Sequence, residues 1–451
     1  MNKTSKSTDK EQKFKKNQLK ILQKESLGYQ PLRMKPVHFA TSFLLCLHRS
    51  YRTLEILNKA ANPRSAEKAQ GDEYVAENLY NRLRQDNIIS STLSLEDFKS
   101  LRPHLKAIFD NDGGAAVAFK PYSTFGCDYS TPSLEYLTNQ SKLHGNSGAF
   151  VWLVLSSTEI GQEFLQLAQK IAESATGPAA NLGNPLLDIE VTEYNKDILE
   201  LCGNPLQSKI AIVSQLMQPQ TEALLCLAKN LQNHPTPYAL RKLIIGVGSW
   251  LLVYQIRRIS GADDTVFFSD FIGESKPRVR VQATACYARQ VGLFGRSLKI
   301  WLSENPHFIV DQEYRDLFEN TEASASKELE DHFRDFSERI GWVQPRSGTS
   351  NKYFRAVPDT MRVLLLSTLN EDEVITIAEL AEKLRIHWRL VFGLLPEDHE
   401  ILRKNGYTPL DEDTDLRANR AAFIQLAKHL GFAWEPSDGL VLFSLNPDKF
   451  T

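Results

Sequence analysis

Apolar residues recur at spacings of three and four along much of the chain, which is the pattern of amphipathic α-helices. Ser94 is suited to cap one of these helices, because a serine hydroxyl accepts a hydrogen bond from a backbone N–H of the first turn. The run from Leu243 to Tyr254 is too short to span a bilayer, so we expect a buried helix there. The pattern predicts helices over residues 36–61, 76–84, 95–109, 150–174, 205–231 and 237–259.

Two stretches near the C-terminus repeat one order of elements. Residues 338–359 and 428–448 each contain the end of a helix, a glycine (Gly341 or Gly431), an aromatic strand, a Pro-Ser-Gly turn and a second aromatic strand. A glycine after a helix suits the left-handed C′ position, and a glycine in the turn supplies the positive φ of a tight hairpin. We therefore predict two β-hairpins, each directly after a helix.

A hairpin that follows several helices is typical of a winged-helix domain, whose recognition helix enters the major groove. We expect helices over 359–370, 375–385 and 413–430, with a further helix opening at His387-Trp388-Arg389. The expected fold is mainly α: a helical scaffold followed by two tandem winged-helix-like units with β-hairpin wings. The expected segments are a flexible basic arm (1–27), a helical domain (28–110), a mixed loop-rich and helical segment (111–185), a helical scaffold with a basic cluster (186–300) and two winged-helix-like units (301–358 and 359–451).

Charge is distributed unevenly along the 451 residues. The net charge is −2, which gives no global electrostatic reason for binding nucleic acid and leaves local patches to decide. Residues 1–24 hold eight lysines against two acids, a composition that predicts a flexible arm, either simply solvated or seeking phosphates.

The stretch 276–299 has basic residues and no acidic one. If its entrance is extended, Arg278 and Arg280 emerge together, and the later basic residues follow along a helix. Guanidinium groups bind phosphates or an acidic protein surface, and a solvated helix face is the plainer alternative. The candidate nucleic-acid-binding residues are Lys276, Arg278, Arg280, Arg289, Arg296 and Lys299 in this stretch, Arg346, Lys352 and Arg355 in the first hairpin, and Arg385 and Arg389 near the expected recognition helix.

The second hairpin is different, because Glu435 and Asp438 make it acidic. Four further acids lie just upstream, between residues 411 and 415. That unit therefore fits a protein partner as well as it fits DNA.

No sequence motif for catalysis, nucleotide binding or a zinc site is present, so no catalytic residue, metal ligand or cofactor is assigned. Cys127 and His144 have no spacing that supports a nucleophile and base. The five scattered cysteines and the absence of an apolar leader predict a cytoplasmic protein without a disulfide framework. One enzymatic alternative is a metal-dependent nuclease whose carboxylates and lysine come from residues 188–196, namely Asp188, Glu190, Glu193 and Lys196.

The strings IGWVQPRSGTSNKYFRAVPD, FIQLAKHLGFAWEPSDGLVLFSLNPDKF and SKPRVRVQATACYARQ resemble uncharacterised accessory subunits of bacterial anti-phage defence and restriction clusters. Such subunits work with a large ATPase or helicase, so the resemblance implies protein partners of that kind. It carries over no catalytic residue. Together with the basic cluster it leads us to expect a non-catalytic subunit that binds double-stranded DNA or bridges proteins in such a complex. A pure protein adaptor without DNA contact is the alternative, and no membrane partner is expected.

Overall fold

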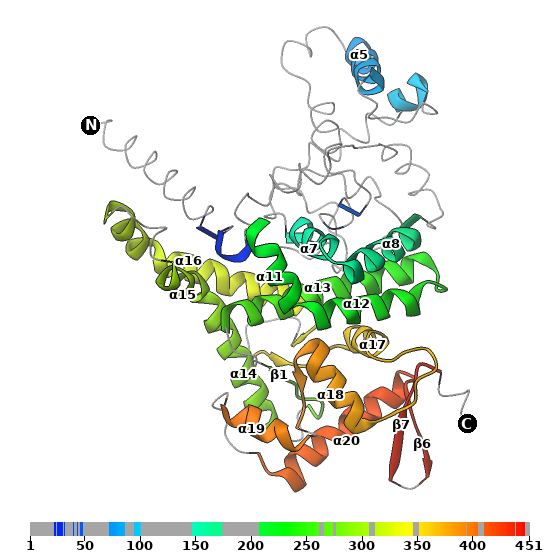
Figure 1. Ribbon diagram of the computed structural model, residues 1–451, viewed down its shortest axis with the longest axis vertical. Helices are drawn as coiled ribbons and strands as arrows, with labels where there is room; N and C mark the ends of the chain where they lie inside the picture. The colour runs from blue at the N-terminus through cyan, green and yellow to red at the C-terminus, as the bar shows by residue number, and fades with distance from the viewer. Residues whose placement is uncertain are drawn as a thin grey trace. The chain divides into compact units, whose positions relative to one another are not determined.

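The computed structural model of this chain is mainly helical (Figure 1). The chain divides into two compact units: unit 1 comprises Met1–Met34, Gln215–Leu231 and Ile245–Thr451, and unit 2 comprises Lys35–Ser214 and Gln232–Ile244. The structure describes residues 22–23, 25–29, 31, 39, 43, 46–47, 72–85, 94–100, 147–173, 207–260, 266–273, 277–305, 312–345, 351–393, 395–404, 410–437 and 439–446.

Unit 2 contains helices α5 (Asp72–Gln85), α7 (Ser147–Ser156), α8 (Glu159–Glu173) and most of α11 (Gln207–Leu216). The helix predicted over 150–174 is two helices, because Thr158 Oγ1 accepts a hydrogen bond from Gly161 N (3.1 Å) at the start of α8. A Cβ at Gly161 would lie 2.0 Å from Leu155 O, so this turn requires glycine. The predicted cap at Ser94 is confirmed, since Asp97 N donates to its hydroxyl (3.1 Å).

Unit 1 begins with a buried N-terminal stretch. Leu27 and Tyr29 are 2% and 0% exposed, and the described residues from 22 to 27 are helical. Tyr254 Oη donates to Leu27 O (3.0 Å), and Gln255 Nε2 donates to Tyr29 Oη (2.7 Å). The expectation of a flexible arm up to residue 27 is therefore wrong at its C-terminal end, because these apolar side chains anchor it. Most of the lysine-rich part lies outside the described residues.

Two long helices follow α11 in the chain. α12 (Gln218–Leu231) starts at a break from α11 with Pro219 in its first turn, where the missing N–H costs nothing. α13 (Thr236–Ser260) matches the helix predicted over 237–259, and its residues from Ile245 on belong to unit 1. By length and composition the stretch Tyr238–Arg258 could cross a membrane, but 94% of its most apolar window is buried in the structure. α13 is thus a core helix, as expected from the sequence.

Three fully buried tryptophans organise the core of unit 1. Each indole N–H donates to a hydroxyl group on another element, which satisfies a buried donor that would otherwise be costly. The pairs are Trp250 with Thr221 (3.3 Å), Trp342 with Ser249 (2.8 Å) and Trp388 with Ser367 (2.9 Å).

Both predicted hairpins are present. β2 (Val343–Gln344) pairs antiparallel with β3 (Tyr353–Phe354), and β6 (Ala433–Ser437) pairs antiparallel with β7 (Leu440–Phe443). The helices before them are α16 (Gln312–Arg339) and α20 (Arg417–His429), and the glycines that follow, Gly341 and Gly431, have φ of 83° and 79°. In each case the next residue donates its N–H back into the last helical turn, which closes the helix as predicted.

The second hairpin belongs to a three-stranded sheet of order β4–β7–β6, in which β4 is Ile375–Thr376. The helices of this region are α17 (Pro358–Leu366), α18 (Ile377–Trp388), α19 (Pro396–Lys404), the π-helical turn η7 (Glu412–Leu416) and α20 (Figure 1). A separate two-stranded sheet joins β1 (Phe267–Phe268) to β5 (Leu390–Val391) in parallel.

The helix expected to open at His387-Trp388-Arg389 does not exist. These residues close α18, and Arg389 is its left-handed C-cap with φ of 57°. The chain then enters β5, whose partner strand lies more than 120 residues upstream. A short-range pattern does not reveal that pairing.

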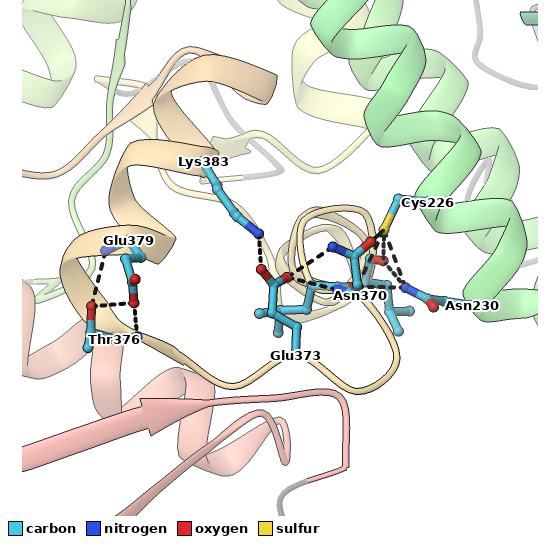
Figure 2. Close-up of polar contacts among 9 residues, drawn as sticks. Cys226, Asn230, Asn370, Glu373, Thr376, Glu379 and Lys383 are labelled. Atoms are coloured by element: carbon cyan, nitrogen blue, oxygen red, sulfur yellow. Dashed lines mark hydrogen bonds and ion pairs between the residues drawn. The ribbon is translucent and has the colours of Figure 1, made fainter. Parts of the chain in front are cut away.

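Figure 2 shows how the turn between α17 and β4 is fixed. Asn230 of α12 donates from Nδ2 to the carbonyl oxygens of Leu366 (2.7 Å), the last residue of α17, and of Leu369 (2.8 Å) in the turn that follows. Glu373 accepts from Asn370 and forms an ion pair with Lys383 of α18.

α18 then starts with a capping box: Thr376 Oγ1 accepts from Glu379 N (3.3 Å), while Thr376 N donates to Glu379 Oε2 (2.7 Å; Figure 2). Side chains of α12 and α18 therefore hold this turn, which connects α17 through β4 to α18.

Candidate nucleic-acid interface

The basic stretch 276–299 forms two helices, α14 (Pro277–Gly295) and α15 (Ser297–Glu304). Pro277 is the first residue of α14, a position that suits proline. The buried side of α14 packs against α16 and β3 and includes Val279, Ala283, Cys286 and Gln290. The expected extended entrance is therefore wrong, whereas the helix expected for the later residues is confirmed.

Two arginines on the outer side of α14, Arg278 and Arg289, lie on one line with Arg296, which directly follows the helix and caps α15. Arg289 and Arg296 follow Arg278 by 11 and 18 residues, about three and five turns of 3.6 residues each. All three side chains are exposed, and that of Arg278 is 76% exposed. The line spans about 27 Å at about 1.5 Å per residue. We call these three residues the arginine line; the exposed Lys299 of α15 follows it in sequence.

Between the arginines, the exposed residues of α14 itself are small or apolar. Val281, Ala285 and Ala288 are exposed, and the space in front of Gly292 is open. Val281 is 59% exposed, which is high for a branched apolar side chain. The sequence has no acidic residue from 276 to 303. A partner's backbone could therefore approach the helix closely between the arginines.

Arg280 points to the opposite side of α14. Two residues along a helix are about 200° apart, so Arg278 and Arg280 do not emerge together. Arg280 Nε lies 3.2 Å from Oδ2 of Asp270, whose side chain is fully buried, and its guanidinium stacks 4.3 Å above the ring of Tyr353. Asp270 also accepts from the backbone N–H groups of Ile272 (2.9 Å) and Gly273 (3.0 Å). Arg280 thus ties the segment after β1 to α14 and β3.

Arg278 has a looser contact of its own. Its Nη1 lies 3.9 Å from Oδ2 of Asp415, a buried carboxylate in η7 just before α20. This contact places the N-terminus of α14 beside the N-terminus of α20.

The basic residues of the first hairpin do not form a shared patch with the arginine line. Lys352 forms an ion pair with Glu338 of α16. Arg355 is half-buried, and a Cβ at Gly273 would lie 2.9 Å from its Nη1. Lys276 and Arg346 lie outside the described residues.

The two candidates near α18 occupy its C-terminal end. Arg385 Nη1 lies 3.6 Å from Asp398 and 3.9 Å from Glu397 of α19. Arg389 caps α18 and is half-buried. These side chains join α18 to its neighbours rather than lining a recognition helix.

None of the residues predicted to bind nucleic acid lies in α20. Its outer side carries Arg417, Ala421 and Gln425, all exposed, and no acid occurs from 417 to 429. The available signal was the position of this acid-free helix immediately before the second hairpin.

The described residues offer little for catalysis. Among them, no group of three or more His, Cys, Asp or Glu side chains is placed to hold a metal ion. Burial raises the pKa of the Cys226 thiol to about 11, so it is protonated at neutral pH and donates to Leu369 O (3.3 Å). The nuclease candidates Asp188, Glu190, Glu193 and Lys196 lie outside the described residues, as do Cys127 and His144.

No protein-family model, curated protein or solved structure matches this chain.

Proposed function

We propose that this chain is a cytoplasmic, non-catalytic subunit that binds duplex DNA through the arginine line and Lys299. The observation that carries the proposal is the alignment of three exposed arginines, two on α14 and one directly after it, in a stretch of the chain that contains no acidic residue. Guanidinium groups bind phosphates in a forked geometry, and contacts of this kind position a protein on DNA whatever its sequence. The two hairpin units that follow a helix are consistent with winged-helix-like domains and support the same function.

The test is a salt titration of the full chain on a fluorescently labelled duplex, with affinity read from anisotropy. Each phosphate contact contributes about 0.9 to the slope of log K against log salt. Replacing Arg278, Arg289 and Arg296 together by alanine should reduce the slope by about 2 to 3 and weaken binding at low salt. The matched control is Arg403→Ala, which removes an exposed cation from α19 in the same unit. An unchanged slope in the triple variant would remove the arginine line from DNA binding.

A pure protein adaptor is the second candidate, and the exposure of Val281 between Arg278 and Arg289 favours it. An apolar residue on a helix face flanked by arginines fits an acidic amphipathic helix of a partner. Val281→Ser should then abolish recovery of a partner protein and leave duplex affinity unchanged.

We also propose that the subunit works in a bacterial DNA-transaction or anti-phage defence complex with an ATPase or helicase. The proposal comes from the sequence resemblance. A tagged chain expressed with its genomic neighbours should retain an ATPase or helicase after nuclease treatment. Recovery of the chain alone would contradict membership of such a complex.

A further inference from the structure

α20 has one side fixed in the core. Asn419 is fully buried, and its Nδ2 donates to Ser269 O (2.9 Å) and Phe392 O (3.2 Å) while its Oδ1 accepts from Phe271 N (2.7 Å). Phe423, one turn further, packs against Phe271, Phe392 and Phe443. These contacts fix the rotation of α20 about its own axis and determine which side chains face solvent.

The opposite side of α20 is exposed and polar. Arg417, Ala421 and Gln425 are each four residues apart, so they lie on one line along the helix. His429 continues this side and is exposed, and the half-buried Lys428 beside it pairs with Glu435 at 2.6 Å. This face therefore carries positive charge and an amide, with one small residue at its centre.

The position of α20 in the fold indicates what its exposed face binds. α17, β4 and α18 precede it, the hairpin β6–β7 follows it directly, and the sheet order is β4–β7–β6. β5, α19 and η7 separate α18 from α20, so the chain has no short turn between these two helices. The resemblance to a winged helix is in the place of α20 directly before the hairpin, which is the place of the helix that enters the major groove of DNA. Arg278 of the arginine line meets Asp415 just before α20, so the two surfaces adjoin.

We propose that α20 reads base edges in the major groove of duplex DNA, with Gln425 and Arg417 as the base-contacting side chains. This inference rests on the proposed function, because the arginine line would hold the backbone while α20 selects the sequence. Lys428 is not assigned to phosphate contact, because it forms an ion pair with Glu435 of the hairpin (2.6 Å).

The side chains on the exposed face of α20 predict which DNA bases it prefers. Glutamine pairs with N6 and N7 of adenine, arginine pairs with O6 and N7 of guanine, and alanine contacts the methyl group of thymine. Arg417 and Gln425 are about 12 Å apart along the helix axis, the length of three to four base-pair steps of about 3.4 Å. The expected DNA sequence is thus short and contains a guanine, bound by Arg417, and an adenine, bound by Gln425.

The test selects duplexes from a randomised pool with the full chain. The wild type should enrich a short sequence over its scrambled version by roughly five- to 150-fold. Gln425→Ala should lose the preference at one position and keep its affinity for a scrambled duplex within twofold. Arg403→Ala, on the neighbouring α19, is the control and should keep the wild-type preference.

The possible outcomes separate this inference from the proposed function. Duplex binding by the wild type without any sequence preference would overturn base reading by α20 and leave the arginine line standing. An unchanged preference in both Gln425→Ala and Arg417→Ala would also overturn it. Loss of a bound partner protein in these two variants, with DNA selection intact, would assign the face to a protein. Absence of all duplex binding by the wild type would refute the proposed function itself.

Discussion

Arg278 and Arg280 carry the same charge two residues apart, yet the structure predicts opposite consequences for their removal. Arg280→Ala leaves the fully buried Asp270 without its cation and removes the stacking on Tyr353. Breaking a buried ion pair from one side costs about 3–5 kcal/mol, and a cation–π contact contributes about 0.5–1 kcal/mol.

Solvent reduces that cost, because the Arg280 side chain is 28% exposed and two backbone N–H groups remain on Asp270. We therefore expect Arg280→Ala to lower the free energy of unfolding by about 2–3 kcal/mol. Arg278→Ala removes only a 3.9 Å contact from a side chain that is 76% exposed, so its cost should stay below about 0.5 kcal/mol.

The assay is urea unfolding followed by tryptophan fluorescence, since Trp342 is fully buried in the same unit as Arg280. Adding Asp270→Asn to Arg280→Ala should recover part of the loss, because no unpaired charge is then buried. The duplex salt slope should fall by about 0.9 for Arg278→Ala and stay unchanged for Arg280→Ala. Equal stability of Arg280→Ala and the wild type, or strictly additive effects in the double variant, would refute this reasoning.

Three further predictions concern single contacts. Asp415→Asn removes the carboxylate that competes with phosphate for Arg278 and should tighten duplex binding by about two- to fivefold in anisotropy titrations, whereas weaker binding would contradict it. Ser249→Ala leaves the buried indole N–H of Trp342 unsatisfied and should cost about 1–3 kcal/mol in urea unfolding. Burial lowers the pKa of His387 to about 4, so the unfolded chain binds a proton before the folded chain does as the pH falls below about 6.5. The free energy of unfolding, measured in urea, should therefore be about 2 kcal/mol lower at pH 5.0 than at pH 7.5, and this difference should disappear in His387→Asn.

The sequence predicted those parts of the fold that depend on residues close together in the chain. Gly341 and Gly431 end their helices in the left-handed conformation, and both hairpins follow as expected from their aromatic strands and turns. The long core helix α13 was also predicted, because its apolar run is continuous. These features depend on a few neighbouring residues, which a sequence shows directly.

The errors arose where distant residues decide the structure. Arg280 has Asp270 ten residues upstream and Tyr353 far downstream as partners, and spacing alone could not assign them. Arg389 ends a helix instead of starting one, because β5 pairs with the remote β1. Pro277 was the overlooked local signal, since a proline at this place favours the first turn of a helix over an extended strand.

The small size of the basic surface implies that the arginine line and Lys299 by themselves would bind DNA weakly. The arginine line and Lys299 supply four cations, which corresponds to a salt slope of about 3 to 4. A protein that makes about 6 to 10 phosphate contacts has a steeper salt dependence than this. The other concentration of positive charge in the chain is the lysine-rich stretch 1–24. Under the proposed function, further phosphate contacts would come from the lysines of residues 1–24 or from a partner subunit. The arginine line would thus set where the chain lies on the duplex, α20 would set which sequence it prefers, and these further phosphate contacts would supply most of the affinity.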